Sequence, residues 1–169
     1  MKHVMAIFAL IFALPQTGAA QDLVFSPAPT VQCLRDAQDL AAREACIGAA
    51  ANACMDNTPG GYSTYGMGGC LDRELTWWDD ELNRIYGPLR QAMRERDREE
   101  AEYSDGAAPS IELALRDMQR AWIDFRDRKC EYEASQWGMG TGRGPAFLGC
   151  LMAETGRQVL YLGGWGGEN

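Results

Sequence analysis

The six cysteines are the residues of this chain with the widest range of chemistry open to them. Cysteine thiolates act as nucleophiles and metal ligands, whereas paired cysteines form disulfides. No C-x-x-C pair occurs, which argues against a thiol oxidoreductase. An even number in an exported chain predicts a disulfide framework, which would leave no thiolate to attack a substrate or bind zinc. The residues are Cys33, Cys46, Cys54, Cys70, Cys130 and Cys150.

The positions of the cysteines favour particular pairs. Cys130 and Cys150 flank a glycine-rich segment, and joining them closes a hairpin of about twenty residues. Cys46 and Cys54 would lie about 12 Å apart along one helix, too far to bond to each other. Six cysteines formally allow fifteen connectivities. The simplest assignment adds the pairs Cys33–Cys46 and Cys54–Cys70.

Few other side chains could carry catalysis. The single histidine is His3, at the N-terminus, so the rest of the chain cannot build a histidine-based triad or a histidine-ligated metal site. Acidic pairs occur at Asp79/Asp80 and Glu99/Glu100, but their charge-rich surroundings are typical of solvated faces. We therefore predict no enzyme activity, no metal and no cofactor. A glycan-cleaving enzyme that uses carboxylates alone is the alternative.

Residues 1–20 have the composition of a secretory signal peptide. Lys2 precedes an apolar run from Val4 to Leu14, Pro15 ends that run, and small residues lead up to Ala20. A run of about ten apolar residues is too short to cross a bilayer, and no cysteine stands next to the cleavage site. We predict cleavage after Ala20, no membrane anchor, and a periplasmic or secreted protein.

The chain is acidic. It has 16 lysines and arginines against 24 aspartates and glutamates, a formal net charge of −8, and removal of Lys2 with the leader would make this −9. This charge argues against a nucleic-acid partner and for repulsion from anionic membranes. It is compatible with a basic protein partner, and equally with acidity that only keeps an exported protein soluble.

The chain after the leader is predicted to form one domain, residues 33–163. An extended lead-in (21–32) precedes this domain, and a flexible tail (164–169) follows it. Residues 33–57 are rich in helix-forming residues, and Gly48 predicts either two short helices or one irregular helix.

Glycine and proline mark the connections between the later helices. Glycine-rich loops are expected at 58–69 and 137–145, and a turn at 104–109. Pro145 suits the first turn of a helix, whereas Pro88 should kink or weaken the helix that contains it.

Three segments repeat apolar residues at spacings of three and four, which predicts amphipathic helices with one buried stripe each. No segment alternates with the period of a strand. The sequence therefore predicts an all-α fold: a small disulfide-stapled helical bundle with two long antiparallel helices, a shorter third helix and an N-terminal helical cap. The stripes are Leu71, Leu75, Trp78, Leu82, Ile85 and Leu89; Ile111, Leu115, Met118, Trp122, Phe125 and Tyr132; and Leu148, Met152, Thr155, Val159 and Leu162.

Motifs in three segments carry a family resemblance: CLDRELTWWDDELNRIYGPL (70–89), LRDMQRAWIDFRDRKCEYEA (115–134) and GCLMAETGRQVLYL (149–162). Together they resemble the LprI-like lysozyme inhibitor family of exported bacterial proteins, from about Cys54 to Leu162. Phe125 departs from the tyrosine common there, and the Cys33/Cys46 segment is additional. The motif residues are Cys70, Glu81, Leu82, Asn83, Tyr86, Gln119, Trp122, Phe125, Arg126, Asp127, Cys130, Cys150 and Arg157.

The spacing of this motif indicates a mainly structural role. Gln119, Trp122 and Arg126 fall on one stripe of a single helix that continues to Cys130. We interpret these residues as polar anchors at the edge of a core, in which Arg126 bonds carbonyls or a carboxylate and Asn83 fixes helix register. A binding groove is the alternative interpretation.

The resemblance implies a secreted helical module that acts on lysozyme in some members of the family. A basic lysozyme-like protein, bound by surface contact, is therefore the predicted partner. Candidate contact residues are Tyr62, Tyr65 and Arg143 in the glycine-rich loops, because Tyr and Arg are enriched in binding hot spots. The alternative is an envelope interaction or structural module with no enzyme target. The sequence indicates no oligomeric state.

Overall fold

The computed structural model of the protein describes residues 22–104 and 108–166. Every regular element among these residues is an α-helix, which confirms the predicted all-α class. The predicted signal peptide and the end of the predicted tail lie outside the described residues. The helices are α1 (Ala28–Asp36), α2 (Leu40–Ala45), α3 (Ala49–Asn57), α4 (Thr64–Ser104), α5 (Ile111–Ser135) and α6 (Arg143–Gly166).

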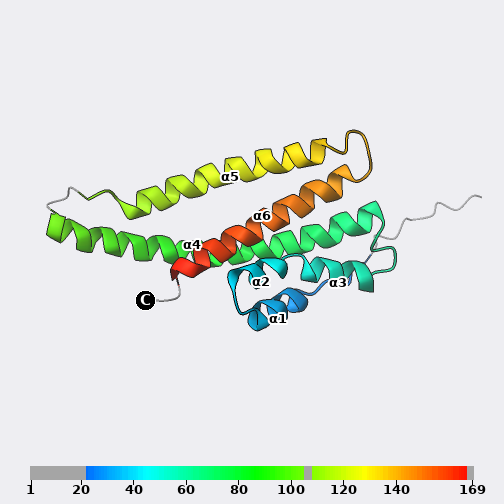
Figure 1. Ribbon diagram of the computed structural model, residues 1–169, viewed down its shortest axis with the longest axis horizontal. Helices are drawn as coiled ribbons and strands as arrows, with labels where there is room; N and C mark the ends of the chain where they lie inside the picture. The colour runs from blue at the N-terminus through cyan, green and yellow to red at the C-terminus, as the bar shows by residue number, and fades with distance from the viewer. Residues whose placement is uncertain (1–21, 105–107, 167–169) are drawn as a thin grey trace, which may run out of the picture.

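Three long helices form the body of the molecule (Figure 1). α4 has 41 residues and is continuous through Pro88, α5 folds back antiparallel to it, and α6 runs parallel to α4. α6, with 24 residues, is only slightly shorter than the 25-residue α5. The short helices α1 to α3 form the N-terminal cap, in which α3 packs on α4 and α2 on α6. α4 and α5 continue beyond the C-terminal end of α6 as a two-helix arm (Figure 1).

The predicted stripes of α4 and α6 meet in one hydrophobic core. Trp78 is the largest fully buried side chain, at 1% exposure. α5 adds partly buried side chains at the edge of this core, including Leu115, Met118 and Trp122. The buried members of the core are Ala51, Leu75, Trp78, Leu82, Leu89, Met152, Val159 and Leu162.

The predicted stripe of α5 is wrong at its C-terminal end. Phe125 and Tyr132 are 58% and 67% exposed. The buried side of α5 instead runs through Gln119 and Cys130. At 100° per residue, Phe125 points roughly 120° away from Gln119, so it cannot face the same neighbours. Apolar periodicity therefore misassigned this face of α5, whereas the motif stripe that runs from Gln119 to Cys130 follows it.

The N-terminal segment is more helical than predicted. The chain lies outside a helix only over residues 22–27, and α1 begins at Ala28, so the prediction of an extended lead-in through residue 32 is wrong. Pro27 and Pro29 do not oppose the helix, because proline is tolerated where a helix starts and backbone N–H groups have no intrahelical partner.

Two further boundaries differ from the prediction. α6 continues to Gly166, into the predicted flexible tail, since the buried Leu162 anchors its last turns in the core. Residues 33–57 contain the end of α1 and the whole of α2 and α3, so the segment holds three helical pieces where two short helices or one irregular helix were expected. Gly48 separates α2 from α3 with φ of 97°, in the left-handed region that favours glycine.

The first glycine-rich loop is shorter than predicted. The second half of segment 58–69 belongs to α4, so Tyr65 lies in a helix and not in a loop. The Ser63 hydroxyl caps this helix by accepting a hydrogen bond from the Gly66 amide at 3.0 Å. Gly66 is required by close packing, because a Cβ there would lie 2.4 Å from the carbonyl oxygen of Gly60.

A buried carboxylate holds the N-terminal cap on α4. Glu74 is 0% exposed, and no cation pairs with it among the described residues. Its Oε1 accepts hydrogen bonds from the Thr30 hydroxyl (2.8 Å), the Gly48 amide (2.9 Å) and the Trp78 indole (3.1 Å). Its Oε2 accepts one from the Ala51 amide at 2.6 Å. These amides lie at the N-terminus of α3, where negative charge is favoured, so Glu74 caps α3 from another helix.

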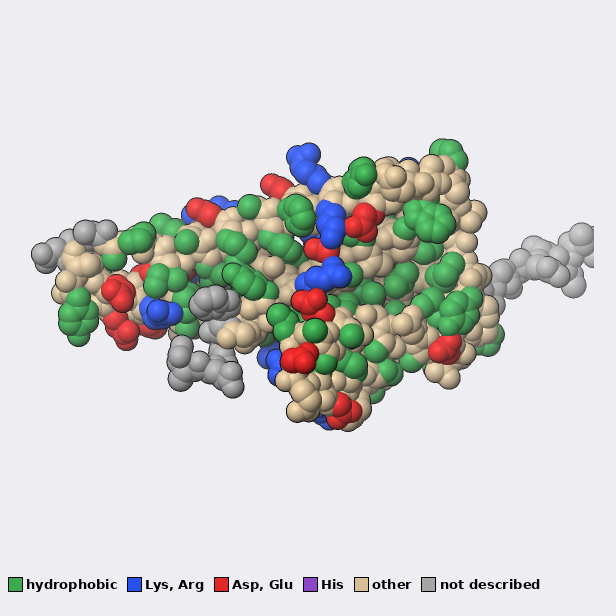
Figure 2. Space-filling model, in the orientation of Figure 1, with side chains coloured by type: hydrophobic (Ala, Val, Ile, Leu, Met, Phe, Trp, Pro, Cys, Tyr) green, Lys and Arg blue, Asp and Glu red, His purple; other side chains and the backbone are tan. Residues whose placement is uncertain are grey.

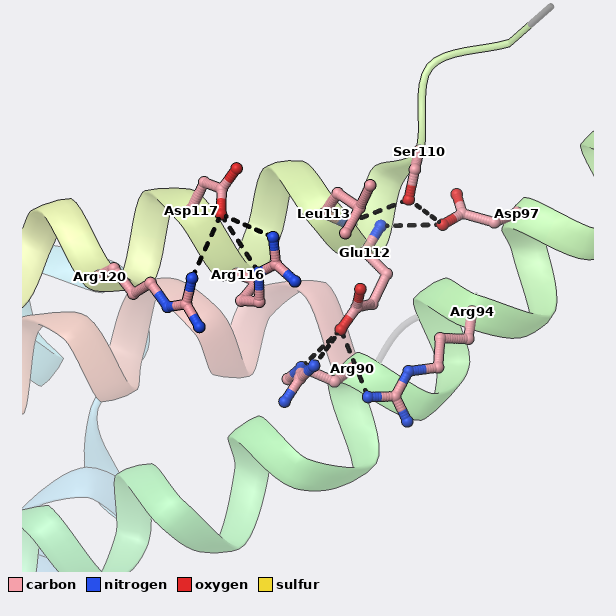
Figure 3. Close-up of polar contacts among 9 residues, drawn as sticks. All are labelled: Arg90, Arg94, Asp97, Ser110, Glu112, Leu113, Arg116, Asp117 and Arg120. Atoms are coloured by element: carbon pink, nitrogen blue, oxygen red, sulfur yellow. Dashed lines mark hydrogen bonds and ion pairs between the residues drawn. The ribbon is translucent and has the colours of Figure 1, made fainter.

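Charged side chains hold the start of α5 on α4 (Figure 3). The nearly buried Glu112 carboxylate points to Arg90, with which it pairs, and lies 3.4 Å from Arg94. Asp97 accepts hydrogen bonds from the Ser110 hydroxyl at 2.6 Å and from the first two amides of α5. The Ser110 hydrogen bond lowers the pKa of Asp97, and the Arg90 hydrogen bond lowers the pKa of Glu112.

Acid should therefore weaken this contact. The folded-state pKa values of Asp97 and Glu112 lie below their unfolded values of about 4. Their contribution to stability is fully present above about pH 5 and is lost as pH falls through the lowered folded-state pKa values. We expect D97N/E112Q to be less stable than the unchanged protein at neutral pH and to lose less stability in acid.

Thermal unfolding between about pH 7 and pH 2 measures this difference. The control is E99Q/E100Q, which removes two exposed carboxylates from α4, the helix that carries Asp97. A D97N/E112Q protein with the pH dependence of the unchanged protein would contradict the assignment.

Candidate functional site

Residues from the first two motif segments line one cleft between α4 and α5. The cleft has a volume of about 250 Å³. The structure thus brings together motif side chains that are far apart in the sequence. The lining residues are Asp79, Leu82, Asn83 and Tyr86 of α4 and Gln119, Trp122, Ile123 and Arg126 of α5.

Arg126 is the polar centre of this cleft. Its guanidinium carbon lies 5.1 Å from the centroid of the Trp122 ring, and its Nη1 lies 3.6 Å from the Asp79 carboxylate. It also donates a hydrogen bond to the Thr155 hydroxyl of α6 at 3.2 Å and pairs with the adjacent Asp127 at 2.9 Å. Burial raises the pKa of Asp79, and Arg126 opposes that rise. One side chain therefore connects all three long helices.

The other motif residues also make contacts within the bundle. The buried Gln119 accepts a hydrogen bond from Gln158 of α6 at 2.8 Å. Arg157 and Lys129 both pair with Glu154, at 2.5 and 2.8 Å. These contacts support a structural role for much of the motif. On α4, Glu81 pairs with Arg84, Asn83 lies exposed at the cleft, and the Tyr86 ring faces Arg90 at 5.7 Å.

Replacing Arg126 with methionine should lower the free energy of unfolding by about 2 kcal/mol, because hydrogen bonds to charged groups contribute about 1.5–3 kcal/mol each. The Arg126 side chain is only 17% exposed. Arg120 on the same helix is 70% exposed, so R120M should change stability by less than about 0.5 kcal/mol. Urea unfolding compares the two variants. Equal losses would mean that Arg126 contributes no more than a surface cation.

The candidate contact residues lie at one end of the bundle, the loop end, which comprises residues 56–65 and 131–143. Because α4 and α6 are parallel, the connections that precede them emerge at the same end of the molecule (Figure 1). Tyr62 and Tyr65 are both more than 60% exposed there, Trp137 is half exposed, and Met139 is fully exposed. Exposed large apolar side chains gathered in this way are typical of protein-binding surfaces.

Polar partners orient two of the predicted contact residues. The Tyr62 hydroxyl donates a hydrogen bond to Asp56, which raises the pKa of the Tyr62 phenol. Arg143 lies in the first turn of α6 and not in the predicted loop, since α6 begins two residues before Pro145. Its guanidinium pairs with Glu131 at 2.5 Å.

Disulfides close both connections of the loop end. All six cysteines are paired, and no free thiol remains. One bond spans the α3–α4 connection, one spans the α5–α6 connection, and one joins α1 to the end of α2. Three disulfides indicate an oxidising, extracytoplasmic compartment. The pairs are those that the spacing favoured: Cys33–Cys46, Cys54–Cys70 and Cys130–Cys150.

Charged and apolar side chains occupy different parts of the surface. On the face drawn in Figure 2, charged side chains form a band across the middle, whereas the loop end carries hydrophobic side chains with few charges. Exposed carboxylates stand on the halves of α4 and α5 nearer the loop end. They include Asp72, Asp80, Asp124, Asp127 and Glu133.

Trp137 and Met139 were not among the residues predicted from sequence to make contacts. The sequence feature that could have indicated them is their position in the segment WGMGTGRG, where the glycines disfavour an amphipathic helix. A large apolar residue in such a segment has no helix face to join and is readily left exposed.

The fold and the site define a disulfide-bonded helical bundle with an exposed aromatic end. Among residues 22–104 and 108–166, no acidic, cysteine or histidine side chains form a group that could hold a metal ion. In the same part of the chain, no helix combines the length and the apolar composition of a membrane span. Residues 54–162 match the family described as lysozyme inhibitor LprI, and the chain belongs to this family.

Similar proteins occur in three bacteria. The chain is 23% identical to an uncharacterised 17.7 kDa protein of Rhodobacter capsulatus, over 79% of its own length and 82% of that protein. It is 32% identical to an uncharacterised protein of Rhizobium meliloti, over 55% and 66% of the two lengths. It is 28% identical to the uncharacterised protein YecT of Escherichia coli, over 55% and 58%. No solved structure gives a significant match.

Proposed function

We propose that this protein inhibits a basic lysozyme-like muramidase by binding it with the loop end. The observation that carries the proposal is the group of exposed side chains formed by Tyr62, Tyr65, Trp137 and Met139, which two disulfides brace. Bracing lowers the entropy cost of binding, because the contact surface is already ordered. Membership of an inhibitor family supplies the class of partner.

Charge supports the same partner. The formal net charge of −8 attracts a basic enzyme at long range and accelerates encounter. The apolar side chains of the loop end then supply short-range contact area, and Arg143 offers a cation to a carboxylate of the partner. At physiological ionic strength, salt screens this long-range electrostatic attraction over a distance of about 8 Å.

We infer that the protein acts by contact and not by chemistry. All six cysteines are consumed in disulfides, and the only histidine is His3, within the proposed leader. In this proposal the leader is removed after Ala20, and the disulfides form in the periplasm or outside the cell. Inhibition should then be reversible, and the target enzyme should be recovered chemically unchanged.

Removing two aromatic side chains of the loop end should weaken inhibition. We expect Y65A/W137A to raise the concentration needed for half-inhibition of cell-wall lysis at least about tenfold, because buried aromatic anchors dominate binding energy. The control is Y103A, since Tyr103 is 88% exposed on α4 at the opposite end of the bundle. Lysis of cell walls by a purified basic muramidase is the measurement.

Salt distinguishes long-range electrostatic attraction from short-range contact in the same lysis assay. Raising the ionic strength should slow association before it changes dissociation. No inhibition at tens of micromolar in low salt would reject the proposal for the enzyme tested and favour an envelope module without an enzyme target. Inhibition that persists after the protein has been removed would indicate covalent damage and reject the contact mechanism.

A further inference from the structure

A second concave surface lies away from the loop end. A groove of about 500 Å³, the cap groove, opens where α1 and α2 meet α4 and α6. Its apolar lining includes Leu34 of α1, Trp77 and Ile85 of α4, and Leu160 of α6. This volume falls within the range of about 300–1,000 Å³ that is usual for small-ligand sites. The cap groove therefore has the size and the lining to hold one apolar chain.

Cations stand around this apolar lining. Arg35 of α1, Arg43 of α2 and Arg84 of α4 all line the cap groove. Arg84 pairs with Glu81 at 2.5 Å. Arg35 and Arg43 are exposed, and neither guanidinium group has an ion-pair or hydrogen-bond partner in the part of the chain that the structure describes. Two guanidinium groups without a side-chain partner therefore stand beside one apolar groove.

We propose that the cap groove binds the carboxylate form of a free single-chain fatty acid. The planar guanidinium groups of Arg35 and Arg43 match the geometry of a carboxylate, which they can hold through paired hydrogen bonds. The acyl chain then lies along the apolar side chains between α1, α4 and α6, where each buried methylene adds to affinity. The site is separate from the loop end and does not depend on muramidase binding.

The surroundings of the groove favour a free ligand over a bilayer. The exposed carboxylates of Asp36, Asp39 and Glu44 lie next to the two arginines in sequence, on α1, α2 and the turn between them. An anionic membrane surface would meet these carboxylates together with the arginines and would be repelled by them. Glu81 also lines the groove, but its carboxylate is paired with Arg84, so a single free carboxylate can pair with the guanidinium groups of Arg35 and Arg43.

Isothermal titration of the full-length protein tests the proposal. Decanoate should bind at least tenfold more tightly than decan-1-ol, and more tightly than octanoate by about fourfold for each buried methylene. The variant R35E/R43E should weaken decanoate binding at least tenfold. The control R96E/R128E makes the same charge change at two exposed arginines outside the groove and should bind decanoate normally. Thermal unfolding verifies that all proteins are folded.

Three results would overturn the proposal. The first is no binding of decanoate at millimolar concentration, and the second is equal binding of decanoate and decan-1-ol. The third is equal weakening by R35E/R43E and R96E/R128E. Sedimentation with phosphatidylglycerol vesicles separates the other source of an anionic lipid. Vesicle binding that needs Arg35 and Arg43, in the absence of decanoate binding, would assign the groove to a membrane surface instead.

Discussion

Replacing Glu74 with alanine should lower the free energy of unfolding by about 3–5 kcal/mol, because each buried donor left without a partner costs about 1–3 kcal/mol. The substitution removes the acceptor for the Thr30 hydroxyl, the Trp78 indole and two amides at the N-terminus of α3. The loss should be concentrated in the N-terminal cap, since Glu74 joins α1 and α3 to α4.

Two variants make the Glu74 experiment specific. Glu81 lies on the same helix, and its carboxylate pairs with the 67% exposed Arg84, so E81A should cost less than about 1 kcal/mol. Glu74→Gln keeps one oxygen but turns an amide donor toward a backbone N–H, so its loss should be intermediate. Chemical denaturation of the three proteins measures the differences. A Glu74→Ala protein as stable as E81A would show that water replaces the carboxylate without cost.

Removing the Cys130–Cys150 disulfide should cost about 3 kcal/mol, from the chain entropy of a loop of about twenty residues. In C130A/C150A the α5–α6 connection, which carries Trp137 and Met139, is no longer closed at its base. We therefore expect muramidase inhibition to weaken along with stability, because the contact surface must be ordered at the moment of binding.

The disulfide of the N-terminal cap provides the matched control. C33A/C46A opens a loop of similar length, with a sequence separation of 13, and should also cost about 3 kcal/mol. It lies away from the loop end and should leave inhibition unchanged. Denaturant titration and the lysis assay together distinguish the two cases. A loss below about 1 kcal/mol for C130A/C150A would mean that helix packing alone holds the connection.

Much of the fold was predictable because it depends on short-range patterns. The buried stripes of α4 and α6 follow from apolar spacing, and the disulfides follow from cysteines that flank glycine-rich segments. Phe125 was wrongly predicted to be buried, because the buried face of a helix depends on the helices packed against it as well as on the spacing of its apolar residues. Glu74 was missed for a related reason. A carboxylate in a charged helix resembles a solvated residue until the short helices that cover it are known.

The candidate site was predictable only in pieces. Tyr62, Tyr65 and Arg143 were predicted as contact residues from two separate segments. Their position at one end depends on the parallel arrangement of α4 and α6, which no local pattern specifies. The cleft around Arg126 likewise needs two helices in register. The predicted helical stripe through Gln119 and Trp122 described one wall, and Asn83 of the other wall was predicted to fix helix register, with a binding groove as the alternative interpretation.

The two-helix arm has a consequence for how the molecule opens. The hydrophobic core reaches along α4 only as far as Met93, so residues 94–104 hold the start of α5 chiefly through Asp97 and its hydrogen bonds. Segments with few buried apolar contacts open locally at a lower free energy than the rest of a domain. We therefore expect the arm to open as a separate unit of low stability, with its amides exchanging with solvent by sub-global opening. The amides of the core helices should exchange only when the whole domain unfolds.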